Sequence, residues 1–346
     1  MGKPYHFAVI GCGGISRVHI EQISKMPNAR LMAVSDIAER NARTVGERAG
    51  VDWYTDYHEL LKRADIDIVN IVTPSGTHAD IVIDAARAGK HVIVEKPIDT
   101  TVAKAQRAII ECHKAGVKLS VVSQHRFDDS TIRVKDELVR GNFGKVFLAQ
   151  ATVHWYRSQA YFERSPGSGT WAMDGGGVLM IQALHTLDVL GYLVGPVSSV
   201  YAHTKTATHP GIEVEDVAVA TVKFENGAFA TISATTSAYP RNTTRLEIYG
   251  EFGSAVIEND DLTHLYFRTV DEPGPMFGGD ALNWADGIRH HEKEVAHRRQ
   301  FEDMIEAIRE NKEPLVNGEE SLKVLRLILA MYESARTNRP IYLSQV

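Results

Sequence analysis

Three glycines near the start of the chain have the spacing to bind a phosphate-containing ligand. The segment AVIGCGGISRVHI places Gly11, Gly13 and Gly14 between an apolar run and an amphipathic stretch. If the run is a buried strand and a helix follows the turn directly, the unpaired amides at the helix start point at whatever fills the turn. In the dinucleotide-binding interpretation Gly11 permits the tight turn and Gly13 lets a pyrophosphate approach the backbone, while Ser16 replaces the usual third glycine. A glycine-rich loop with no ligand is the alternative.

Asp36 strengthens the dinucleotide interpretation. The segment ARLMAVSDI predicts a second strand, and Asp36 at its end has the spacing at which a carboxylate accepts hydrogen bonds from the adenosine ribose hydroxyls. The same carboxylate would repel a 2′-phosphate, so NAD is favoured over NADP. Arg40 keeps NADP open, because an arginine just beyond can stack on adenine or hold a phosphate.

Strand and helix patterns alternate up to about residue 125. Near-continuous Val/Ile runs such as DIDIVNIV and HVIV lie between amphipathic stretches, which is typical of a parallel sheet covered on both faces. We therefore predict a doubly wound Rossmann domain over residues 1–125. Ligands of such sheets lie beyond the carboxyl ends of the strands, so the segments Thr73–His78, Glu95–Pro97 and Ser123–Arg126 are expected to face one cleft.

The pattern changes after residue 125. Longer alternating segments follow, and FENGAF contains an Asn-Gly pair between two alternating runs, which is a strong hairpin signal. We predict a second domain of α+β class over residues 126–346, built on a large, mainly antiparallel open sheet with one face covered and one free.

Composition narrows the class of protein. A chain of 346 residues exceeds the usual size of one core, which favours two domains. The net charge of −6 argues against nucleic acid, because a surface that binds a duplex needs many Lys and Arg. Cys12 and Cys112 are too few for a secreted fold held by disulfides, so we expect free thiols in a reducing cytoplasm. We expect neither a secretory signal nor a membrane helix.

A histidine-rich segment, RHHEKEVAH, invites a metal interpretation. It contains His290, His291, Glu292 and His297. Metal ligands on a helix need to lie one turn apart on one face, and this spacing does not assemble such a set. We therefore predict no metal.

The segment EKP, taken with the glycine loop and GGGVLMIQALHTLDVL, resembles the glucose-fructose oxidoreductase and inositol dehydrogenase family, often written Gfo/Idh/MocA. The resemblance covers essentially the whole chain. It implies a Rossmann domain followed by a mainly antiparallel sheet domain whose open face commonly forms a dimer or tetramer interface. It also implies an NAD(P)-dependent dehydrogenase acting on a hydroxyl of a sugar, inositol or sugar nucleotide. The segments SQHRF, WYRSQAYF and GTWAMDGGGVLM look like the branch that contains UDP-N-acetylglucosaminuronate dehydrogenases.

Within this resemblance, two residues suit the handling of a hydroxyl proton. Hydride transfer from a carbinol needs a group that takes the proton and a group that holds the developing alkoxide. Lys96, expected at a strand end beside the nicotinamide, can donate to the reacting oxygen. His185 can accept the proton, because imidazole titrates near neutral pH. The alternatives are a lysine in a surface salt bridge and a histidine satisfied within the core.

One position departs from the family pattern. Many relatives have Asp four residues before the histidine, and the uronate branch typically has Asn, but this chain has Ile181, which can neither orient a side chain nor accept a proton. The departure weakens the case for chemistry like that of inositol dehydrogenase. We expect Lys96 and His185 to suffice, with Gln182 helping to position the sugar. Asp188 is expected to orient the helix or a neighbouring side chain, or to form a structural salt bridge.

Aromatic residues and arginines predict the substrate contacts. The segments HWYRSQAY and GTWAMDGGG combine aromatic rings with Arg157, which suits a sugar face against Trp or Tyr and a charged group against guanidinium. Packing roles are the alternative for these residues, and Gly175–Gly177 are expected to permit a close turn rather than to bind phosphate. The predicted substrate-binding residues are Lys96, Arg126, Tyr156, Arg157, Trp171, Gln182 and His185. The predicted cofactor-binding residues are Gly11, Gly13, Gly14, Ile15, Asp36, Arg40, Thr73, Pro74, His78, Glu95, Lys96 and Gln124.

The leading hypothesis is therefore a cytoplasmic, NAD-dependent, homo-oligomeric dehydrogenase of a sugar or sugar nucleotide. A free-sugar or inositol dehydrogenase stays open, as does an oxidoreductase that exchanges hydride between two substrates while retaining its cofactor. A non-catalytic NAD-binding sensor is the alternative from another class. The sequence leaves open which sugar and which carbon react, the physiological direction, and whether two or four chains assemble.

Overall fold

The protein divides into two compact units in a computed structural model that describes residues 3–163, 167–268 and 295–345. The first unit contains the chain up to Gln124, the short segment Ala172–Gly175, and the segment ending at Leu322 that includes helix α10 (Val295–Glu310). The rest of the chain from His125 onward belongs to the second unit. The second unit thus begins beside the predicted boundary at residue 125. Two later segments that we had assigned to the second domain belong to the first.

The first unit is built on a sheet of six parallel strands. In spatial order they are β3 (Asp52–Tyr54), β2 (Ala29–Ser35), β1 (Tyr5–Ile10), β4 (Ile68–Ile71), β5 (His91–Val94) and β6 (Leu119–Val121). The sequence forms this sheet because its central strands are mostly apolar and buried: Phe7, Ala8 and Val9 of β1 are all fully buried, as expected of a strand covered on both faces. The order and the parallel pairing confirm the predicted doubly wound fold.

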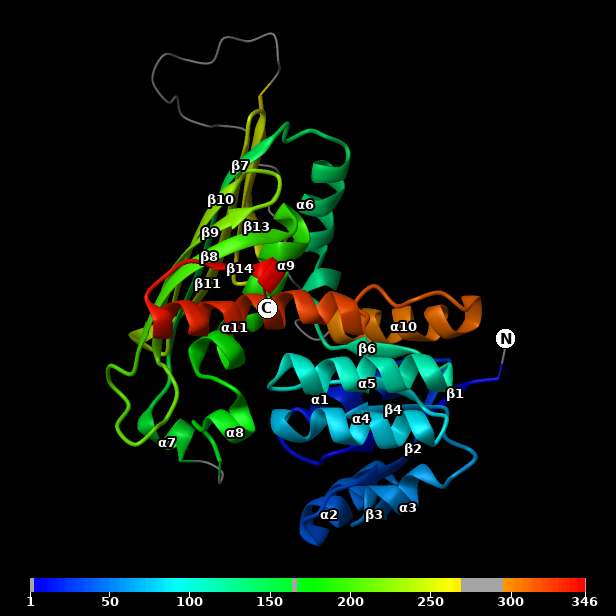
Figure 1. The fold of residues 1–346 in the computed structure, drawn as a ribbon. Coiled ribbons are helices and arrows are strands. Elements are labelled where there is room, and N and C mark those ends of the chain that lie inside the picture. The colour runs from blue at the N-terminus through cyan, green and yellow to red at the C-terminus, as the bar shows by residue number, and fades with distance from the viewer. Residues whose placement is uncertain (1–2, 164–166, 269–294, 346) are drawn as a thin grey trace, which may run out of the picture. The chain divides into compact units, whose positions relative to one another are not determined.

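Helices cover both faces of this sheet. Helices α4 (His78–Arg87) and α5 (Val102–Ala115) lie side by side over one face (Figure 1). Helix α1 (Ser16–Ser24) and α10 cover the other, where Ile23 and Phe301 pack in one buried cluster with Val9 and Ile68. Other helical segments within this unit are α2 (Glu39–Ala49), α3 (Tyr57–Leu61), the 3₁₀ turn η1 (Ser75–Thr77), and all of the short helix α8 (Trp171–Asp174) after its first residue.

The second unit is built on an eight-stranded sheet. In spatial order its strands are β13 (Asp261–Phe267), β12 (Gly253–Glu258), β11 (Ser237–Gly250), β7 (Val146–Tyr156), β10 (Phe229–Thr235), β9 (Val217–Phe224), β8 (Val197–Lys205) and β14 (Ile341–Tyr342). Every pairing is antiparallel except that of β10 with β7, which is parallel. The predicted Asn-Gly hairpin joins β9 to β10, and the mainly antiparallel sheet confirms the predicted fold class.

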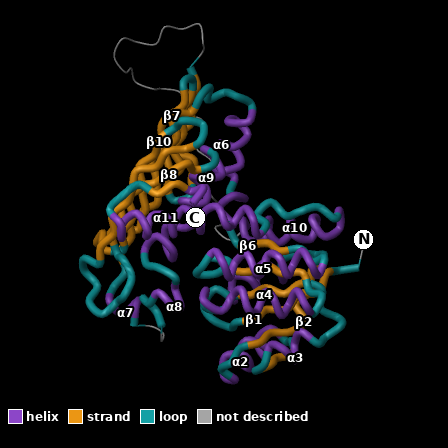
Figure 2. Tube along the Cα trace, viewed as in Figure 1, coloured by secondary structure: helices purple, strands orange, loops and turns teal. Residues whose placement is uncertain are grey.

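One face of this second sheet carries the helices. Figure 2 shows α6 (Asp129–Val139) and α9 (Leu184–Val194) along one side of the strands. Along β9, Ala218, Ala220 and Val222 are buried, while Val219 on the opposite face is 45% exposed. This alternation is what an antiparallel sheet shows when one face is packed and one is free. Other helical segments of the second unit are the 3₁₀ turns η2 (Gln124–Phe127) and η4 (Leu343–Gln345), the short helix α7 (Gln159–Phe162) and the π-helix η3 (Leu179–Ala183). Helix α11 (Gly318–Thr337) begins in the first unit and belongs to the second from Lys323 onward.

Among the described residues, one helical stretch has the length and apolar composition that could cross a membrane. It runs from Trp171 to Val194 with a mean hydropathy of 1.5 in its most apolar window, and 78% of that window is buried inside the protein. We had expected no such segment from the sequence. Its burial is that of a core helix in a soluble protein, which passes the same test.

Candidate active site

The glycine loop has the geometry of a dinucleotide-binding turn. Gly11 follows β1 with a φ of +100°, and a Cβ at this position would lie 2.7 Å from the Val72 carbonyl oxygen, so only glycine fits. At Gly13 and Gly14 a Cβ would meet no atom of the described chain within 4 Å, so the protein itself leaves that space open. Ser16 is buried and donates its hydroxyl to the Gly13 carbonyl at 2.6 Å, which closes the turn into α1.

Asp36 lies directly beyond β2 at the edge of the same loop. Its carboxylate accepts the backbone N–H of Cys12 at 2.8 Å and that of Ala38 at 2.8 Å. These bonds fix the carboxylate beside the glycine turn, where its other lone pairs can accept ribose hydroxyls. Burial and the Asp36 charge raise the pKa of the Cys12 thiol to about 12, so this cysteine stays an unreactive thiol. Arg40 is exposed in the first turn of α2.

The loop after β4 and the segment after β5 are joined by His78. The ring of this buried histidine lies 2.8 Å from the Thr73 carbonyl oxygen through Nε2 and 2.7 Å from the Pro97 carbonyl oxygen through Nδ1. Burial lowers the pKa of His78, while the two carbonyls act in the opposite direction. Pro74 is exposed at the turn between them. Thr73, Pro74 and His78 thus lie at the carboxyl edge of the sheet, next to the segment that carries Lys96.

Glu95 and Lys96 stand at the end of β5 in a charged cluster. Glu95 is buried, and its Oε1 accepts from Nε2 of the fully buried His19 at 3.0 Å while Oε2 accepts the Lys96 backbone N–H at 3.1 Å. Burial raises the pKa of Glu95, but the hydrogen bond from His19 and the charges of His19, His297 and Lys96 outweigh it and lower the pKa to about 2. Lys96 is half-buried; burial lowers the pKa of its ammonium, and the charges of Glu95 and Asp174 oppose that effect. The cluster keeps a carboxylate beside the lysine at all physiological pH values.

The histidine-rich segment for which we predicted no metal lies only partly within the described residues. His290, His291 and Glu292 lie outside the described residues, whereas His297 is buried on α10 with its ring 5.9 Å from the ring of His19. The ligand atoms of His19, Glu95 and His297 lie close enough together to suit a metal ion by spacing. However, Nε2 of His19 bonds to Glu95, and its Nδ1 lies 3.0 Å from the side-chain amide of Asn70. Both ring nitrogens are therefore used within the protein.

His185 lies near the start of α9 with a second histidine against it. The ring of His125, in η2, is 5.1 Å from the His185 ring in an edge-on arrangement. His125 Nδ1 is bonded to Asp128 at 2.6 Å and lies 3.3 Å from Asp260. Burial lowers the pKa of His125, but the Asp128 hydrogen bond and the charges of Asp260, Asp128 and Asp188 outweigh it, so the pKa is raised. Sequence reasoning missed His125, although it stands inside the quoted SQHRF segment.

Arg126 has a different role from the one predicted. Its guanidinium bonds in a bidentate manner to Asp188, with Nε 2.8 Å and Nη2 2.7 Å from the two carboxylate oxygens. Both side chains are at most 3% exposed, and the guanidinium also lies over the Tyr192 ring. A fully buried and paired guanidinium cannot bind a substrate, which corrects the prediction for Arg126. The ion pair fixes α9, and this is the structural salt bridge expected as one role of Asp188.

Arg157, Tyr161 and Gln182 form a contiguous polar and aromatic group. The Arg157 guanidinium lies 4.6 Å from the centre of the Trp155 ring and 5.3 Å from that of Tyr161. The Tyr161 hydroxyl accepts from Gln182 Nε2 at 3.2 Å. Gln182 belongs to the π-helix η3, a rare form that is frequent at functional sites. Trp155 and Tyr161 were not predicted, although the WYRSQAY segment carried the signal.

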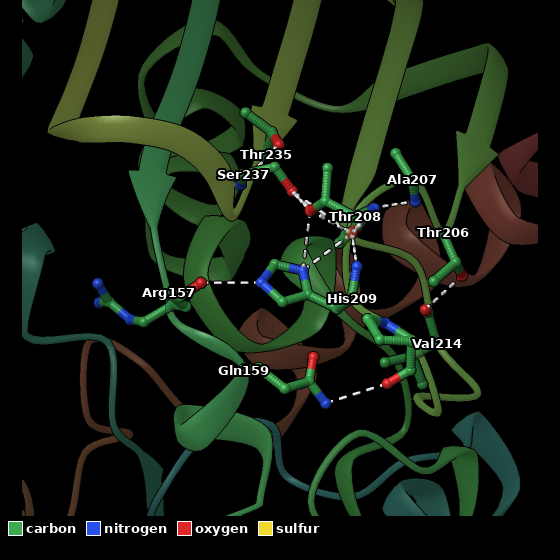
Figure 3. A network of polar contacts seen from close by, with 11 residues as sticks. Arg157, Gln159, Thr206, Ala207, Thr208, His209, Val214, Thr235 and Ser237 are labelled. Atoms are coloured by element: carbon green, nitrogen blue, oxygen red, sulfur yellow. Dashed lines mark hydrogen bonds and ion pairs between the residues drawn. The ribbon is translucent and has the colours of Figure 1, made fainter.

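A buried network holds the backbone at Arg157 (Figure 3). His209 Nε2 lies 2.8 Å from the Arg157 carbonyl oxygen, and His209 Nδ1 lies 2.9 Å from Asp216. Burial raises the pKa of Asp216, but N–H donors from Thr208 and Ala207 together with His209 outweigh it and lower the pKa. The carboxylate thus fixes both the loop before β9 and the turn that presents Arg157.

Two other predicted substrate residues, Tyr156 and Trp171, are exposed. Tyr156 is 40% exposed and packs edge-on against Tyr239. Trp171 is 44% exposed, donates its ring N–H to the Glu213 carbonyl at 3.1 Å, and contacts the Tyr332 ring. Both rings can therefore be reached from solvent.

The three glycines Gly175–Gly177 serve close packing. A Cβ at Gly177 would lie 1.7 Å from the Glu215 carbonyl oxygen, and one at Gly176 would lie 2.0 Å from the Tyr332 hydroxyl. The carboxylate of Glu215 accepts the N–H groups of Gly177 at 2.8 Å and Leu179 at 2.9 Å, which caps the start of η3. This is the close turn that the sequence predicted in place of a phosphate site.

The residues at the carboxyl edge of the first sheet fit a dinucleotide. The open space at Gly13 and Gly14 and the fixed carboxylate of Asp36 match the pyrophosphate and ribose positions. Gln124 is also buried, and its Oε1 has no hydrogen-bond partner within the described parts of the chain. A buried amide oxygen of this kind normally finds a partner, which a bound ligand can supply.

Comparison with known families decides the class. Residues 5–123 match the model described as "Oxidoreductase family, NAD-binding Rossmann fold" (Gfo/Idh/MocA), and residues 135–343 match the model of its C-terminal alpha/beta domain. The chain belongs to this family. As a Gfo/Idh/MocA member it is an NAD-dependent oxidoreductase, and the predictions of family, enzyme class and NAD as cofactor are confirmed. The enzyme assignment also removes the non-catalytic sensor from consideration.

Solved and curated members of the Gfo/Idh/MocA family match almost the whole chain. The WlbA dehydrogenase from Bordetella pertussis, in complex with NADH and UDP-GlcNAcA, is 32% identical with a TM-score of 0.86, covering 98% of this chain and 99% of that one. The WlbA dehydrogenase from Chromobacterium violaceum, with the same two ligands, is also 32% identical with a TM-score of 0.86, covering 99% and 96%. The myo-inositol 2-dehydrogenase of Thermotoga maritima is 28% identical over 98% of each chain.

Proposed function

We propose that the protein oxidises a secondary hydroxyl of a nucleotide-linked sugar, with NAD as the hydride acceptor. The observation that carries this proposal is the full-length similarity, at 32% identity, to two dehydrogenases whose structures hold NADH and UDP-GlcNAcA. The fold and the family would also suit a free sugar, so the nucleotide and the acidic group are the specific parts of the proposal.

The group around Arg157 supports an anionic, sugar-containing substrate. A guanidinium flanked by the Trp155 and Tyr161 rings offers a cation for a phosphate or carboxylate beside apolar faces on which a sugar ring can lie. Gln182, bonded to Tyr161, adds an amide that can orient a sugar hydroxyl. Tyr156 and Trp171 remain candidates for further contacts, because both rings are exposed.

Lys96 and His185 handle the hydroxyl in this proposal. His185 accepts the hydroxyl proton as a neutral imidazole, and the Lys96 ammonium donates a hydrogen bond to the same oxygen as negative charge develops on it. Bound NAD supplies a nicotinamide carbon that accepts the hydride from the carbon that bears the hydroxyl. The carbinol then becomes a carbonyl, with the proton on His185. The nearby Glu95 charge helps to keep Lys96 protonated for this task.

The cofactor is held by the first unit in this proposal. The N–H groups of the loop Gly11–Ile15 receive the pyrophosphate, and Asp36 accepts the ribose hydroxyls. Arg40 lies at the adenine end, while Thr73, Pro74, His78, Glu95 and Gln124 line or support the nicotinamide end. The carboxylate of Asp36 favours NAD over NADP.

A free-sugar or inositol dehydrogenase is the second candidate. The similarity to the myo-inositol 2-dehydrogenase supports it, whereas Ile181, in place of the acid found in many such relatives, argues against it. An enzyme that retains its nicotinamide and exchanges hydride between two substrates would use the same residues.

A substrate panel tests the proposal directly. The protein is incubated with NAD or NADP and with UDP-linked uronic acids, UDP-sugars, free sugars or inositols, and the absorbance of the reduced nicotinamide is followed. Turnover confined to the nucleotide-linked acids is the expected result. Turnover of free sugars or inositols alone would contradict the nucleotide-linked substrate. A nicotinamide that stays bound through purification and is turned over only by paired substrates would indicate hydride exchange. The Lys96→Met variant is the control for background reduction.

Assembly and location belong to the same proposal. The uncovered face of the eight-stranded sheet exposes Val219 (45%) and Phe229 (59%), which supports a homodimer or homotetramer through this face. Two buried free thiols, Cys12 and Cys112, support a reducing cytoplasm. Light scattering of the purified protein tests the assembly, and a monomer at micromolar concentration would contradict it.

A further inference from the structure

Four residues far along the chain form part of the unit that carries Lys96. The segment Ala172–Gly175 belongs to the first unit, whereas Trp171 before it and Gly176 after it belong to the second. A segment this short joins a foreign unit only where close contacts hold it. Its contacts show what it brings to that unit.

Two glycines permit the contacts of this segment. A Cβ at Gly76, in η1, would lie 2.5 Å from the Ala172 carbonyl oxygen, so the backbones meet directly there. At the other end, Gly175 has a φ of +71°, and its Cβ would lie 2.7 Å from Cγ2 of Thr100. Neither position accepts a larger residue without displacement. The segment is therefore fixed against the first unit on both sides of Asp174.

Both contact points belong to segments that are joined to the Lys96 segment. Thr100 follows Lys96 by four residues on the segment after β5, and Gly76 belongs to the loop that His78 joins to the Pro97 carbonyl oxygen at 2.7 Å. Asp174, between Ala172 and Gly175, thus stands over the segment that presents the lysine. Among the described residues, the carboxylates of Glu95 and Asp174 have charges that favour the Lys96 ammonium.

The two carboxylates differ in what else they serve. Glu95 accepts from His19 Nε2 at 3.0 Å and from the Lys96 backbone N–H at 3.1 Å, so much of its acceptor capacity is used away from the ammonium. Asp174 approaches the lysine from another segment of the chain. A charged group held from two directions has less freedom to swing away from a reacting oxygen.

We propose that Asp174 is a positioning residue for Lys96: its carboxylate holds the ammonium in the orientation needed to donate to the reacting oxygen. This inference rests on the proposed role of Lys96 in the reaction. The chain has Ile181 where many members of its family have an acid, and Asp174 supplies an acid from a different segment.

The first test measures the lysine without substrate. In the intact protein, the Lys96 amine is labelled with acetic anhydride over a range of pH values, and the labelled peptide is quantified by mass spectrometry. Only the neutral amine reacts, so the midpoint reports the Lys96 pKa. Removing the Asp174 charge removes one of the two groups that favour the ammonium. The midpoint of Asp174→Asn is therefore expected at lower pH than that of the wild type, and Asp174→Glu should restore it.

Matched variants and kinetics complete the test. Glu225→Gln removes an exposed carboxylate from the β9–β10 turn and should leave the midpoint unchanged. With substrate, Asp174→Asn should lower kcat about tenfold at neutral pH, less than the loss expected for Lys96 itself, and should move the alkaline limb of the pH profile to lower pH. Binding of NAD, measured by fluorescence titration, should not change.

The outcomes separate this inference from the proposed function. A labelling midpoint in a folded Asp174→Asn protein equal to that of the wild type overturns the inference, whatever the substrate is. If Asp174→Asn does not fold, Asp174→Ser and Asp174→Glu decide on the same criterion. A shifted midpoint together with no turnover of nucleotide-linked sugars supports the role of Asp174 and rejects the proposed substrate.

Discussion

The charged clusters beside Lys96 and beside His185 are built in different ways. At Lys96 the buried carboxylate of Glu95 accepts from two donors, the His19 ring and the backbone N–H of Lys96. Beside His185, the buried guanidinium of Arg126 pairs in a bidentate manner with Asp188, 62 residues away in the sequence. The Glu95 carboxylate thus accepts from two separate groups, whereas the Asp188 carboxylate binds one guanidinium through both of its oxygens.

Because of this difference, substitutions at the two clusters should affect different properties of the protein, turnover at Lys96 and stability at the Arg126–Asp188 pair. Lys96, a residue that is only half-buried, can change its charge or its contacts while the surrounding fold persists, so substitutions there should alter turnover first. A guanidinium that is fully buried with one carboxylate is left as an uncompensated charge when that carboxylate is lost. Substitutions at the ion pair should therefore alter stability first. The predictions below test this division.

The largest effect is expected from Lys96→Met and His185→Ala. Each should lower kcat by about 10²- to 10⁴-fold, because each removes a group that handles the hydroxyl proton or the alkoxide charge. Thermal unfolding should change little in Lys96→Met. Steady-state kinetics on the true substrate measure the effect, and normal turnover in both variants would show that the assignment is wrong. The double variant should lose much less than the product of the single losses, since the proposed reaction has the two residues act on one oxygen.

A large loss of stability is expected from Asp188→Asn. Leaving Arg126 buried without its carboxylate costs about 3–5 kcal/mol. For a unit of this size, the thermal midpoint should then fall by about 6–20 °C. Differential scanning calorimetry measures the change. As a matched control, Glu333→Gln removes the partner of Arg336 from an exposed ion pair, which is worth about 0–1 kcal/mol. Equal thermal midpoints for Asp188→Asn and Glu333→Gln would show that the buried ion pair contributes no more to stability than an exposed one.

A smaller effect is expected from Asp36→Asn. The amide cannot supply the negative charge that favours ribose hydroxyls over a 2′-phosphate, so the Kd for NAD should rise about tenfold and the preference over NADP should shrink. Fluorescence titration with both cofactors measures the two values. Glu47→Gln, an exposed carboxylate on α2, is the control. An unchanged NAD to NADP ratio would remove Asp36 from the basis of cofactor choice.

The smallest effect is expected from His125, and it depends on pH. Burial lowers the folded-state pKa of His125, but Asp128, Asp260 and Asp188 outweigh this effect, so the pKa is raised. A raised pKa contributes stability that is fully present at acid pH, below the unfolded value, and is lost as the pH rises through the folded value. The difference in thermal midpoint between the wild type and His125→Gln should thus be larger at pH 6 than at pH 9. The opposite trend would indicate that His125 is neutral in the folded protein.

The sequence predicted those parts of the molecule that local patterns determine. The glycine loop and Asp36 stand at fixed distances along one strand-turn-helix-strand unit, so their spacing alone places them together. The Asn-Gly turn between β9 and β10 is equally local. Buried parallel strands have a recognisable composition, and for this reason the Val/Ile runs predicted the doubly wound parallel sheet of the first domain.

Contacts between distant segments carry no such local signal. Nothing near Arg126 indicates that Asp188 will take up its guanidinium, and nothing near His297 indicates that it will lie beside His19 rather than with the preceding histidines. The parallel pairing of β10 with β7, within an otherwise antiparallel sheet, joins strands about eighty residues apart. Such pairings are decided by packing over the whole unit, which periodicity cannot reveal.

The position of α10 bears on the order in which the chain can fold as it is synthesised. All six strands of the first sheet have left the ribosome once residue 121 has emerged, but one face of that sheet is closed by Phe301, Met304 and Ile305 of α10. For most of translation the growing chain therefore carries an apolar sheet face without its cover. The first unit is therefore completed only after α10 has been synthesised. Chaperone contact during synthesis should centre on the sheet face that α10 covers.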